Sequence, residues 1–360
     1  SQILGTNAFH AMIQPQGAGL PLNVGHNLSG LGWDSVRDGN LDYAGRVFWK
    51  DGATLFHCGF VGCLPDQKLG VIVLQNTSGS QCDMIGIRAL QWATLDKIGL
   101  HWVTNFVPPL LPAASRPQAE LDAMAGVFAG KGYHRVIAEP GSLTLVHNAH
   151  LDSPDIYTNM VPRSNGWFAA SDSARSEIVV TNIGERILLM ERFADVWGKD
   201  TSIIGERVEP PAFSAAWSNR LNRIFIARQF HPDDILFAYP GNVTVTIAER
   251  DGFMLLQANE HYVAQPTNDS VAFIAGLPNR HDNSIRFEAM PGGEWMSYAS
   301  YRYQDIAHVP ALAIGSDTNG AIPASNGVAW YRIEAVAGAR YRVRVGNPPG
   351  AMRIRIFDAA

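Results

Sequence analysis

The sequence predicts a mainly β protein that begins with a small α/β part. From residue 118 onward, short runs of alternating apolar and polar residues are separated by turns, for example at 142–146, 177–181 and 186–190. This rhythm is typical of an antiparallel barrel or sandwich. Before residue 107, two apolar runs flank a Pro-Asp turn and precede apolar residues at helical spacing. Because 360 residues exceed what one hydrophobic core usually holds, we expect several domains.

The first part of the chain is expected to form a sheet covered by a helix. Residues 56–64 and 69–74 should pair as an antiparallel hairpin around Pro65 and Asp66. The second run lacks alternation, which predicts a strand buried on both faces. Between Met84 and Ile98, apolar side chains recur three and four residues apart, which predicts an amphipathic helix that ends at Gly99 and packs on the sheet.

The remaining sequence divides into a linker and three β units. The proline-rich residues 108–117 predict a stiff linker between domains. Residues 141–145 resemble 252–256 and residues 186–195 resemble 294–303, which indicates an internal repeat of about 110 residues. We therefore expect a first domain at 1–107, a first barrel at 118–210, a second barrel at 211–307 and a small sandwich-like β unit at 308–360.

Several function classes are excluded by composition and motifs. The net charge of −5 gives no reason to bind nucleic acid, and no apolar run is long enough to span a bilayer. The sequence lacks a P-loop, a dinucleotide-binding glycine motif, Gly-x-Ser-x-Gly and His-Glu-x-x-His, so no cofactor is expected. His147, His150 and Asp152 could be considered as metal ligands. In a strand, however, the two histidines would point to opposite faces, and we expect no metal.

The stretch from Arg46 to Asn76 is the most informative part of the sequence. It contains Lys50-Asp51-Gly52, and Pro65 follows fifteen residues after Lys50. Together with the Gly-Leu-Gly-Trp of residues 30–33, it resembles the C-terminal part of the serine β-lactamase and penicillin-binding-protein superfamily. The nearest branch is the class-C-like hydrolases, with their D-aminopeptidase, esterase and carboxypeptidase relatives. In that family a Lys-or-His-x-Gly motif lies on a strand beside the active site. A second register, with His57-Cys58-Gly59 at the motif, leaves too few residues before the turn.

The resemblance implies roles for four residues. Lys50 would supply positive charge near the nucleophile and a substrate carboxylate, and Gly52 would leave the strand bare where substrate lies alongside. The backbone N–H of Ala53 would be one of two oxyanion-hole donors, and Thr54 would line the same wall. Without the resemblance, Lys50-Asp51-Gly52 is alternatively a solvated turn, because Asp-Gly is a favoured hairpin dipeptide.

The sequence departs from the family at the nucleophile. No lysine in the chain follows a serine by three positions, so the family's Ser-x-x-Lys pair is absent. Tyr157-Thr158-Asn159 spells the family's Tyr-x-Asn element, but it falls in the first predicted barrel, where we regard it as chance. We therefore expect the C-terminal region of a serine hydrolase for a peptide, ester or β-lactam, inactive alone and lacking its N-terminal catalytic segment.

The resemblance extends to the barrels and the compartment. Some D-aminopeptidase-like members carry lipocalin-like barrels after the catalytic domain, and residues 118–307 look similar to such a pair. This implies a periplasmic or extracellular location. Four tryptophans in the barrels are expected to be core residues rather than ligand-stacking ones. They are Trp167, Trp197, Trp217 and Trp295.

Two other functions are compatible with the sequence. One is a non-catalytic β-barrel module that binds substrate, cell wall or a partner protein. Its test is whether residues 1–107 form an open sheet with an exposed apolar face. The other is a hydrolase that uses Ser1 as an N-terminal nucleophile, although the sequence offers no oxyanion partner for it.

Overall fold

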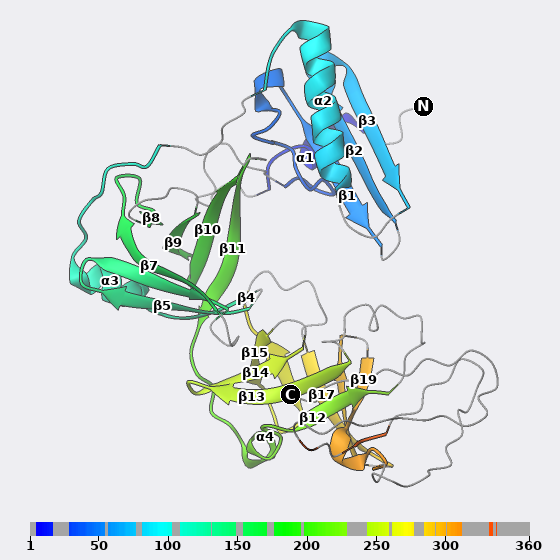
Figure 1. Cartoon of the computed structure of the whole chain (residues 1–360), viewed down its shortest axis with the longest axis vertical. Coiled ribbons are helices and arrows are strands. Elements are labelled where there is room, and N and C mark those ends of the chain that lie inside the picture. The colour runs from blue at the N-terminus through cyan, green and yellow to red at the C-terminus, as the bar shows by residue number, and fades with distance from the viewer. Residues whose placement is uncertain are drawn as a thin grey trace, which may run out of the picture. The chain divides into compact units, whose positions relative to one another are not determined.

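The structure is a computed structural model that describes fifteen segments of the chain and one further residue (Figure 1). These are residues 5–16, 29–54, 57–76, 81–102, 109–130, 132–148, 154–170, 176–195, 198–228, 243–258, 261–276, 284–291, 293–299, 301–311, 331–333 and 336. Ser1, His150, Asp152, Trp197 and nearly all of the predicted 308–360 unit lie outside the described residues. The chain divides into two compact units, residues 1–128 with 134–207 and residues 129–133 with 208–360.

Residues 5–102, the sheet subdomain, contain a three-stranded antiparallel sheet in the order β1-β2-β3. Its elements are α1 (Thr6–Met12), η1 (Asp42–Ala44), β1 (Phe48–Ala53), β2 (Cys58–Leu64), η2 (Pro65–Gln67), β3 (Leu69–Gln75) and α2 (Cys82–Ile98). The predicted hairpin is confirmed, with Val61 opposite Ile72 across β2 and β3. The predicted helix is also confirmed, and it ends at Gly99 in the left-handed conformation.

The prediction that the second hairpin strand is buried on both faces is wrong. In β3, Leu69, Val71 and Val73 pack into the core, whereas Ile72 and Leu74 are 72% and 81% exposed. The apolar run shows no alternation because both faces of the strand carry apolar side chains, although only one face is covered. The sheet therefore closes a core on one side and presents apolar surface on the other.

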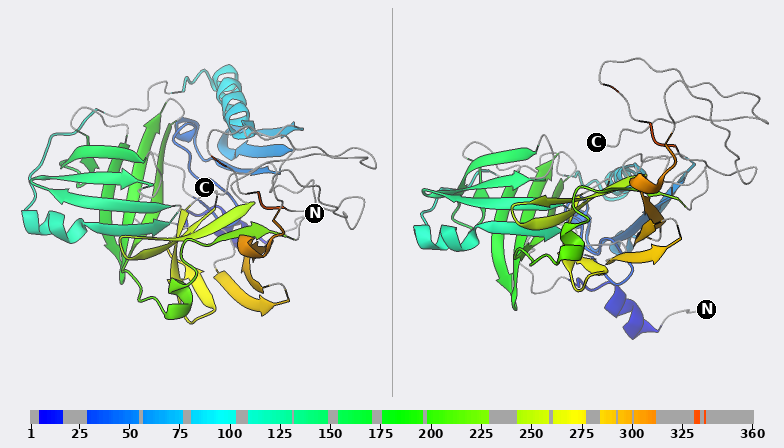
Figure 2. Two further views of the ribbon diagram at one scale, coloured as in Figure 1. Left: turned by 60° about the horizontal axis from the view of Figure 1, so that its bottom comes forward. Right: turned by 90° about the horizontal axis from the view of Figure 1, so that it is seen from below.

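Helix α2 lies close against the covered face of the sheet (Figures 1 and 2). Gly86 faces the Phe60 ring, and a Cβ atom on this glycine would overlap that ring. The buried residues of the helix are Cys82, Gly86, Leu90, Gln91 and Thr94, so small side chains as well as the predicted Leu90 face the sheet. Small residues are needed because the aromatic ring of β2 fills the space beneath the helix.

The first barrel closes in the order β10-β11-β4-β5-β6-β7-β8-β9. Its elements are α3 (Gln118–Met124), β4 (Gly126–Gly130), β5 (Tyr133–Glu139), β6 (Ser142–His147), β7 (Asp155–Pro162), β8 (Phe168–Ala169), β9 (Ser176–Ile183), β10 (Arg186–Asp195) and β11 (Gly198–Val208). Helix α3 lies at one end of this barrel (Figure 2) and places fully buried Leu121 in its core. The proline-rich segment before α3 runs along the barrel, where the Ala114 N–H donates to the Pro162 carbonyl at 2.8 Å.

The second barrel also closes with eight strands, in sequence order. Its elements are α4 (Ala215–Ser218), β12 (Ile224–Ala227), β13 (Thr244–Arg250), β14 (Phe253–Gln257), β15 (His261–Pro266), β16 (Val271–Ile274), β17 (Ser284–Met290), β18 (Gly293–Tyr298), β19 (Tyr301–Asp305) and η5 (Ile306–His308). Fully buried Trp217 of α4 meets Phe287 edge-to-face, with ring centroids 5.4 Å apart. The predicted mainly β fold with a small sheet and two antiparallel barrels is therefore confirmed.

The internal repeat corresponds to equivalent strands of the two barrels. Residues 141–145 and 252–256 both begin at a glycine with positive φ and enter the third strand, β6 or β14. Residues 186–195 and 294–303 both include the seventh strand, β10 or β18. Each barrel is also preceded by a short helix with a fully buried apolar residue, Leu121 or Trp217. The two barrels thus share strand order as well as sequence pattern.

Candidate functional site

Lys50 lies in the middle of β1, which is an edge strand of the small sheet. It is paired with Val61 of β2, and the pairing of the two strands continues beyond it to Ala53 and Cys58. The interpretation of Lys50-Asp51-Gly52 as a solvated turn is therefore wrong. Trp49, its neighbour, packs into the core under α2, so the Lys50 side chain lies on the opposite face, together with Val61 and Ile72.

The ammonium group of Lys50 holds the carboxylate of Asp34. Lys50 Nζ lies 2.9 Å from Asp34 Oδ1 and 2.7 Å from Asp34 Oδ2, and it also donates to the Asp51 carbonyl at 2.5 Å. The Asp51 backbone N–H donates to Asp34 Oδ2 at 2.9 Å. A lysine and a strand-edge amide thus form a small anion-binding arrangement, and a side chain of the protein occupies it.

The segment that carries Asp34 is fixed to β1 by backbone hydrogen bonds. The Asp34 N–H donates to the Trp49 carbonyl at 3.1 Å, and Ser35 and Trp49 form a bridge with the Trp49 N–H donating at 2.9 Å. Buried Asp38 accepts the Trp49 indole N–H at 2.6 Å and the Asn40 N–H at 2.7 Å. Burial raises the pKa of Asp38. These contacts set the position of the Asp34 carboxylate relative to Lys50.

The Ala53 N–H points toward the open edge of β1. Backbone N–H groups alternate in direction along a strand. The N–H groups of Trp49 and Asp51 donate away from β2, and that of Thr54 donates toward the turn, to the His57 carbonyl at 2.7 Å. By this alternation the Ala53 amide shares the edge on which Asp34 is bound. The Asp51 and Ala53 amides form a row of donors that begins beside Lys50.

Gly52 has no structural role that requires glycine, whereas the side chain of Thr54 makes hydrogen bonds at the end of β1. A Cβ atom on Gly52 would meet no described atom within 4 Å, and its φ is not positive, so neither packing nor backbone conformation requires glycine there. The Thr54 hydroxyl accepts the His57 N–H at 3.1 Å and lies 3.3 Å from the His57 carbonyl. The Thr54 side chain therefore closes the turn between β1 and β2.

The two aspartates of the site are perturbed in opposite directions. Burial acts to raise the pKa of Asp34, but hydrogen bonds from Asp51 and Lys50 outweigh it and lower the pKa. Burial, and then the neighbouring Asp34 carboxyl group, raise the pKa of Asp51 to about 6. At neutral pH Asp34 is therefore ionised, and Asp51 titrates close to the physiological range.

We expect the Asp51 carboxyl group to titrate with a midpoint near the raised pKa, and Asp34→Asn to lower that midpoint toward the ordinary value. The measurement is carboxyl ¹³C NMR against pH. Because the pKa of folded Asp51 is raised, its ionisation costs folding stability as the pH rises from about 4 through 6, and the sheet subdomain gains stability when the pH falls back through that window. Solvent screening keeps this contribution below about 1 kcal/mol. An Asp51 midpoint at the value of a free aspartate would contradict the described geometry.

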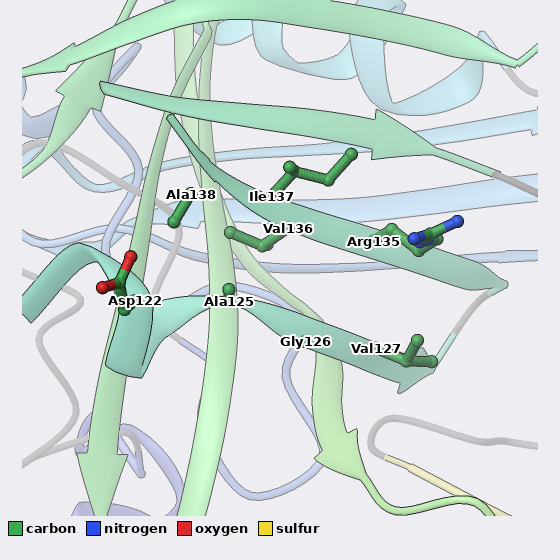
Figure 3. A pocket seen from close by; sticks show the side chains of 8 residues that line it. All are labelled: Asp122, Ala125, Gly126, Val127, Arg135, Val136, Ile137 and Ala138. Carbon is green, nitrogen blue, oxygen red and sulfur yellow. The ribbon is translucent and has the colours of Figure 1, made fainter. Parts of the chain in front are cut away.

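A depression of about 380 Å³ lies between the end of α3 and strands β4 and β5 (Figure 3). Its lining is mostly aliphatic and is contributed by Asp122, Ala125, Gly126, Val127, Arg135, Val136, Ile137 and Ala138. None of the four predicted site residues lines it. The depression brings no nucleophile together with a base, so it does not define a catalytic centre.

Inside the first barrel, His134 and His147 stack with ring centroids 4.5 Å apart. They occupy the same interior-facing rows as Val136 of β5 and Leu145 of β6. Burial lowers the pKa of His134 to about 3, so its imidazole is neutral. His147 Nδ1 is buried with no hydrogen-bond partner among the described residues. Those residues contain no group of three or more side chains suited to a metal ion.

Two of the three described tryptophans, Trp167 and Trp217, follow the expectation of a core position, and Trp295 does not. Trp167 and Trp217 are buried, and each lies beneath an arginine, with Arg192 Cζ 4.5 Å from the Trp167 ring and Arg220 Cζ 4.9 Å from the Trp217 ring. Trp295 is half-buried. Trp167 and Trp217 are therefore core residues.

Asp34 is the site residue that sequence reasoning missed. It directly follows the Gly-Leu-Gly-Trp of residues 30–33, but it stands sixteen residues before Lys50 and belongs to no motif used in the prediction. Its place at the strand edge depends on long-range contacts, among them the bridge between Ser35 and Trp49. A motif search limited to Lys-x-Gly therefore finds the ammonium group but not its partner.

No known protein family and no curated protein matches the chain. Among solved structures, the chain is similar to the octameric penicillin-binding protein homologue from Pyrococcus abyssi, with 16% identity and a TM-score of 0.22 over 57% of this chain and 41% of that one. It is also similar to TolB from Acinetobacter baumannii, with 9% identity and a TM-score of 0.12 over 71% of this chain and 78% of that one. The chain spans about two fifths of the length of the first protein. Likenesses this distant do not bear on function. Within the described residues, every helix is too short or too polar to cross a membrane.

Proposed function

We propose that the sheet subdomain forms one wall of a serine-hydrolase site for a peptide, ester or β-lactam. In this proposal the wall contributes Lys50 and the Ala53 N–H, and the attacking serine belongs to polypeptide outside residues 5–102. The observation that carries the proposal is the row of donors at the open edge of β1. There Lys50 and the Asp51 amide bind the carboxylate of Asp34, and the Ala53 amide is the next N–H along the same edge of the strand.

The chemistry of such a row suits acyl transfer. When a nucleophile attacks a carbonyl carbon, negative charge develops on the carbonyl oxygen, and a positioned N–H donor stabilises that charge. One donor of this kind contributes about 3 kcal/mol to lowering the barrier. The Ala53 N–H would take this role, and the bare strand at Gly52 would let the substrate lie against β1. The wall has no nucleophile of its own in this scheme, so it binds an acyl compound without turning it over.

The uncovered face of the sheet favours a further segment of polypeptide beside this wall. Ile72 and Leu74 are exposed on the face that also carries Lys50. Exposed apolar surface next to a polar site is typical of a region that another segment covers. We propose that the covering segment carries the catalytic serine and its activating lysine.

The proposal predicts that a neutral acyl ligand binds at β1 and is not hydrolysed. With N-acetyl-D-alanine methyl ester added to the ¹⁵N-labelled chain, the Ala53 and Asp51 amide signals should shift in a saturable way. Gly52→Val should weaken this binding by at least about 10-fold, because a branched side chain then blocks the strand without disturbing the core. Gly70→Val is the matched control, a strand glycine in β3 with only ordinary van der Waals contacts around its Cβ position.

Two outcomes would count against the proposal. Ala53 and Asp51 amides that do not respond to the ester would exclude the wall from acyl recognition. Hydrolysis at a serine within residues 5–102 would contradict a wall without its own nucleophile. Shifts confined to His134 and His147 would instead favour the second candidate, a ligand-binding first barrel. The observation behind that candidate is a pair of buried ring nitrogens inside the first barrel, His134 Nε2 and His147 Nδ1, that have no hydrogen-bond partner among the described residues.

A further inference from the structure

Asp34 fills the positions that a substrate carboxylate would need at the proposed wall. An ammonium group has three donors. Those of Lys50 are directed at Asp34 Oδ1, Asp34 Oδ2 and the Asp51 carbonyl, at 2.9, 2.7 and 2.5 Å. The adjacent Asp51 amide is also taken by Asp34. Lys50 therefore has no donor left for an incoming anion.

Displacing Asp34 would be costly because its backbone is part of the structure at this edge. The Asp34 N–H and the Ser35 N–H both donate to the Trp49 carbonyl, at 3.1 and 3.2 Å. The aspartate thus reaches Lys50 from a segment bonded to β1 and not from a free loop tip. An anionic ligand would have to break three hydrogen bonds to the carboxylate and leave Asp34 without its partners.

The charge around the wall also disfavours an anion. Lys50 contributes one positive charge, and Asp34 and Asp51 contribute negative charge on either side of it. Asp83 at the start of α2 adds a third carboxylate whose charge acts on Asp51. The four groups sum to a negative local charge at neutral pH, so a second carboxylate would be repelled.

We propose that Asp34 is a specificity-determining residue that restricts this wall to acyl compounds without a carboxylate beside the reacting carbonyl. This inference rests on the proposed function. The matching ligands are neutral esters and amides, whose carbonyl oxygen needs only the Ala53 N–H. Peptides with a free C-terminal carboxylate at this point and β-lactams that carry a carboxylate would be poor ligands. Asp34 thus selects the substrate class by occupying the carboxylate position.

The test compares a neutral probe, N-acetyl-D-alanine methyl ester, with N-acetyl-D-alanine, which has a free carboxylate in place of the methyl ester, by amide shifts of the full chain at pH 7.5. The wild-type chain should prefer the ester by at least about 10-fold. Asp34→Asn should raise the affinity for the carboxylate by at least about 10-fold and leave the ester affinity within about 3-fold. Adding Lys50→Met to Asp34→Asn should abolish that gain.

Asp42→Asn is the matched control, because Asp42 forms an ion pair with Arg37, at 3.1 Å, and makes no contact with Lys50 among those described. It should leave both affinities unchanged. If Asp34→Asn fails to fold, Asp34→Ser and the wild-type preference still decide the question. Equal wild-type affinity for the two probes would overturn the role of Asp34 and leave the proposed wall intact. The same would follow if Asp34→Asn did not raise the affinity for the carboxylate probe. No Ala53 response to either probe in any variant would overturn the proposed function itself.

Discussion

Replacing Glu177 with glutamine is expected to lower the free energy of unfolding of the first barrel by about 3–5 kcal/mol. Glu177 of β9 is 4% exposed and accepts hydrogen bonds from Nε and Nη2 of Arg192 on β10, with Nε at 2.7 Å. The guanidinium group also lies over the Trp167 ring, so it cannot turn to solvent without losing that contact. Removing the carboxylate charge leaves a largely buried cation uncompensated. Hydrogen exchange of the β9 and β10 amides measures the loss.

A surface pair provides the control for this prediction. Arg116 and Glu120 are four residues apart at 3.4 Å, and Glu120 is 53% exposed. Glu120→Gln should change the stability of the same barrel by no more than about 0.5 kcal/mol, since exposed pairs are screened by water and salt. Similar losses for Glu177→Gln and Glu120→Gln would show that burial does not govern the strength of the Glu177–Arg192 pair.

Gly86→Val is expected to destabilise the sheet subdomain by about 3 kcal/mol, the upper end of typical overpacking costs. The new side chain has no room above the Phe60 ring, so α2 must move away from β2. Hydrogen exchange of the β2 amides would report the change. Asp96→Val, at an exposed position of the same helix, introduces the same branched residue without the clash and should cost about 0.5 kcal/mol.

A double variant tests whether the loss arises from overpacking against the Phe60 ring, since valine has a higher intrinsic helix propensity than glycine. Phe60→Ala alone should cost about 3–5 kcal/mol through the cavity that it leaves. Combined with Gly86→Val, it should cost less than the sum of the two changes by at least about 1 kcal/mol, because valine then fills part of the space. Strictly additive losses would mean that Gly86 and Phe60 do not contact each other as described.

The sequence was sufficient to predict the mainly β fold and the pairing of the first hairpin, because both depend on local pattern. Turns at short intervals predict antiparallel neighbours, and Pro65-Asp66 marks the hairpin turn. The sequence was not sufficient to predict the burial of β3, because an apolar run looks the same whether one face of the strand or both faces are covered. Ile72 and Leu74 are exposed because no described element covers them. The sequence of a strand does not show whether another element packs on its second face.

The residues of the candidate site likewise divide into those that the sequence could predict and those that it could not. Lys50 and Gly52 could be selected because they form a short motif at a recognisable distance from a turn. Asp34 could not, because its contact with Lys50 depends on hydrogen bonds between segments that are distant in sequence. The small residues of α2 were missed for a related reason. Their size matches the Phe60 ring on another element, and helical periodicity alone carries no information about that ring.

The equivalence of the two barrels bears on how the chain arose. The same strand order, the same glycine entering the third strand and a short helix before each barrel make tandem duplication of one ancestral gene segment the simplest account. Among the described residues, the first barrel contains the buried Glu177–Arg192 pair, whereas the second joins Arg220 and Arg223 through Glu294. The two barrels therefore share one architecture, whereas their buried ion pairs differ.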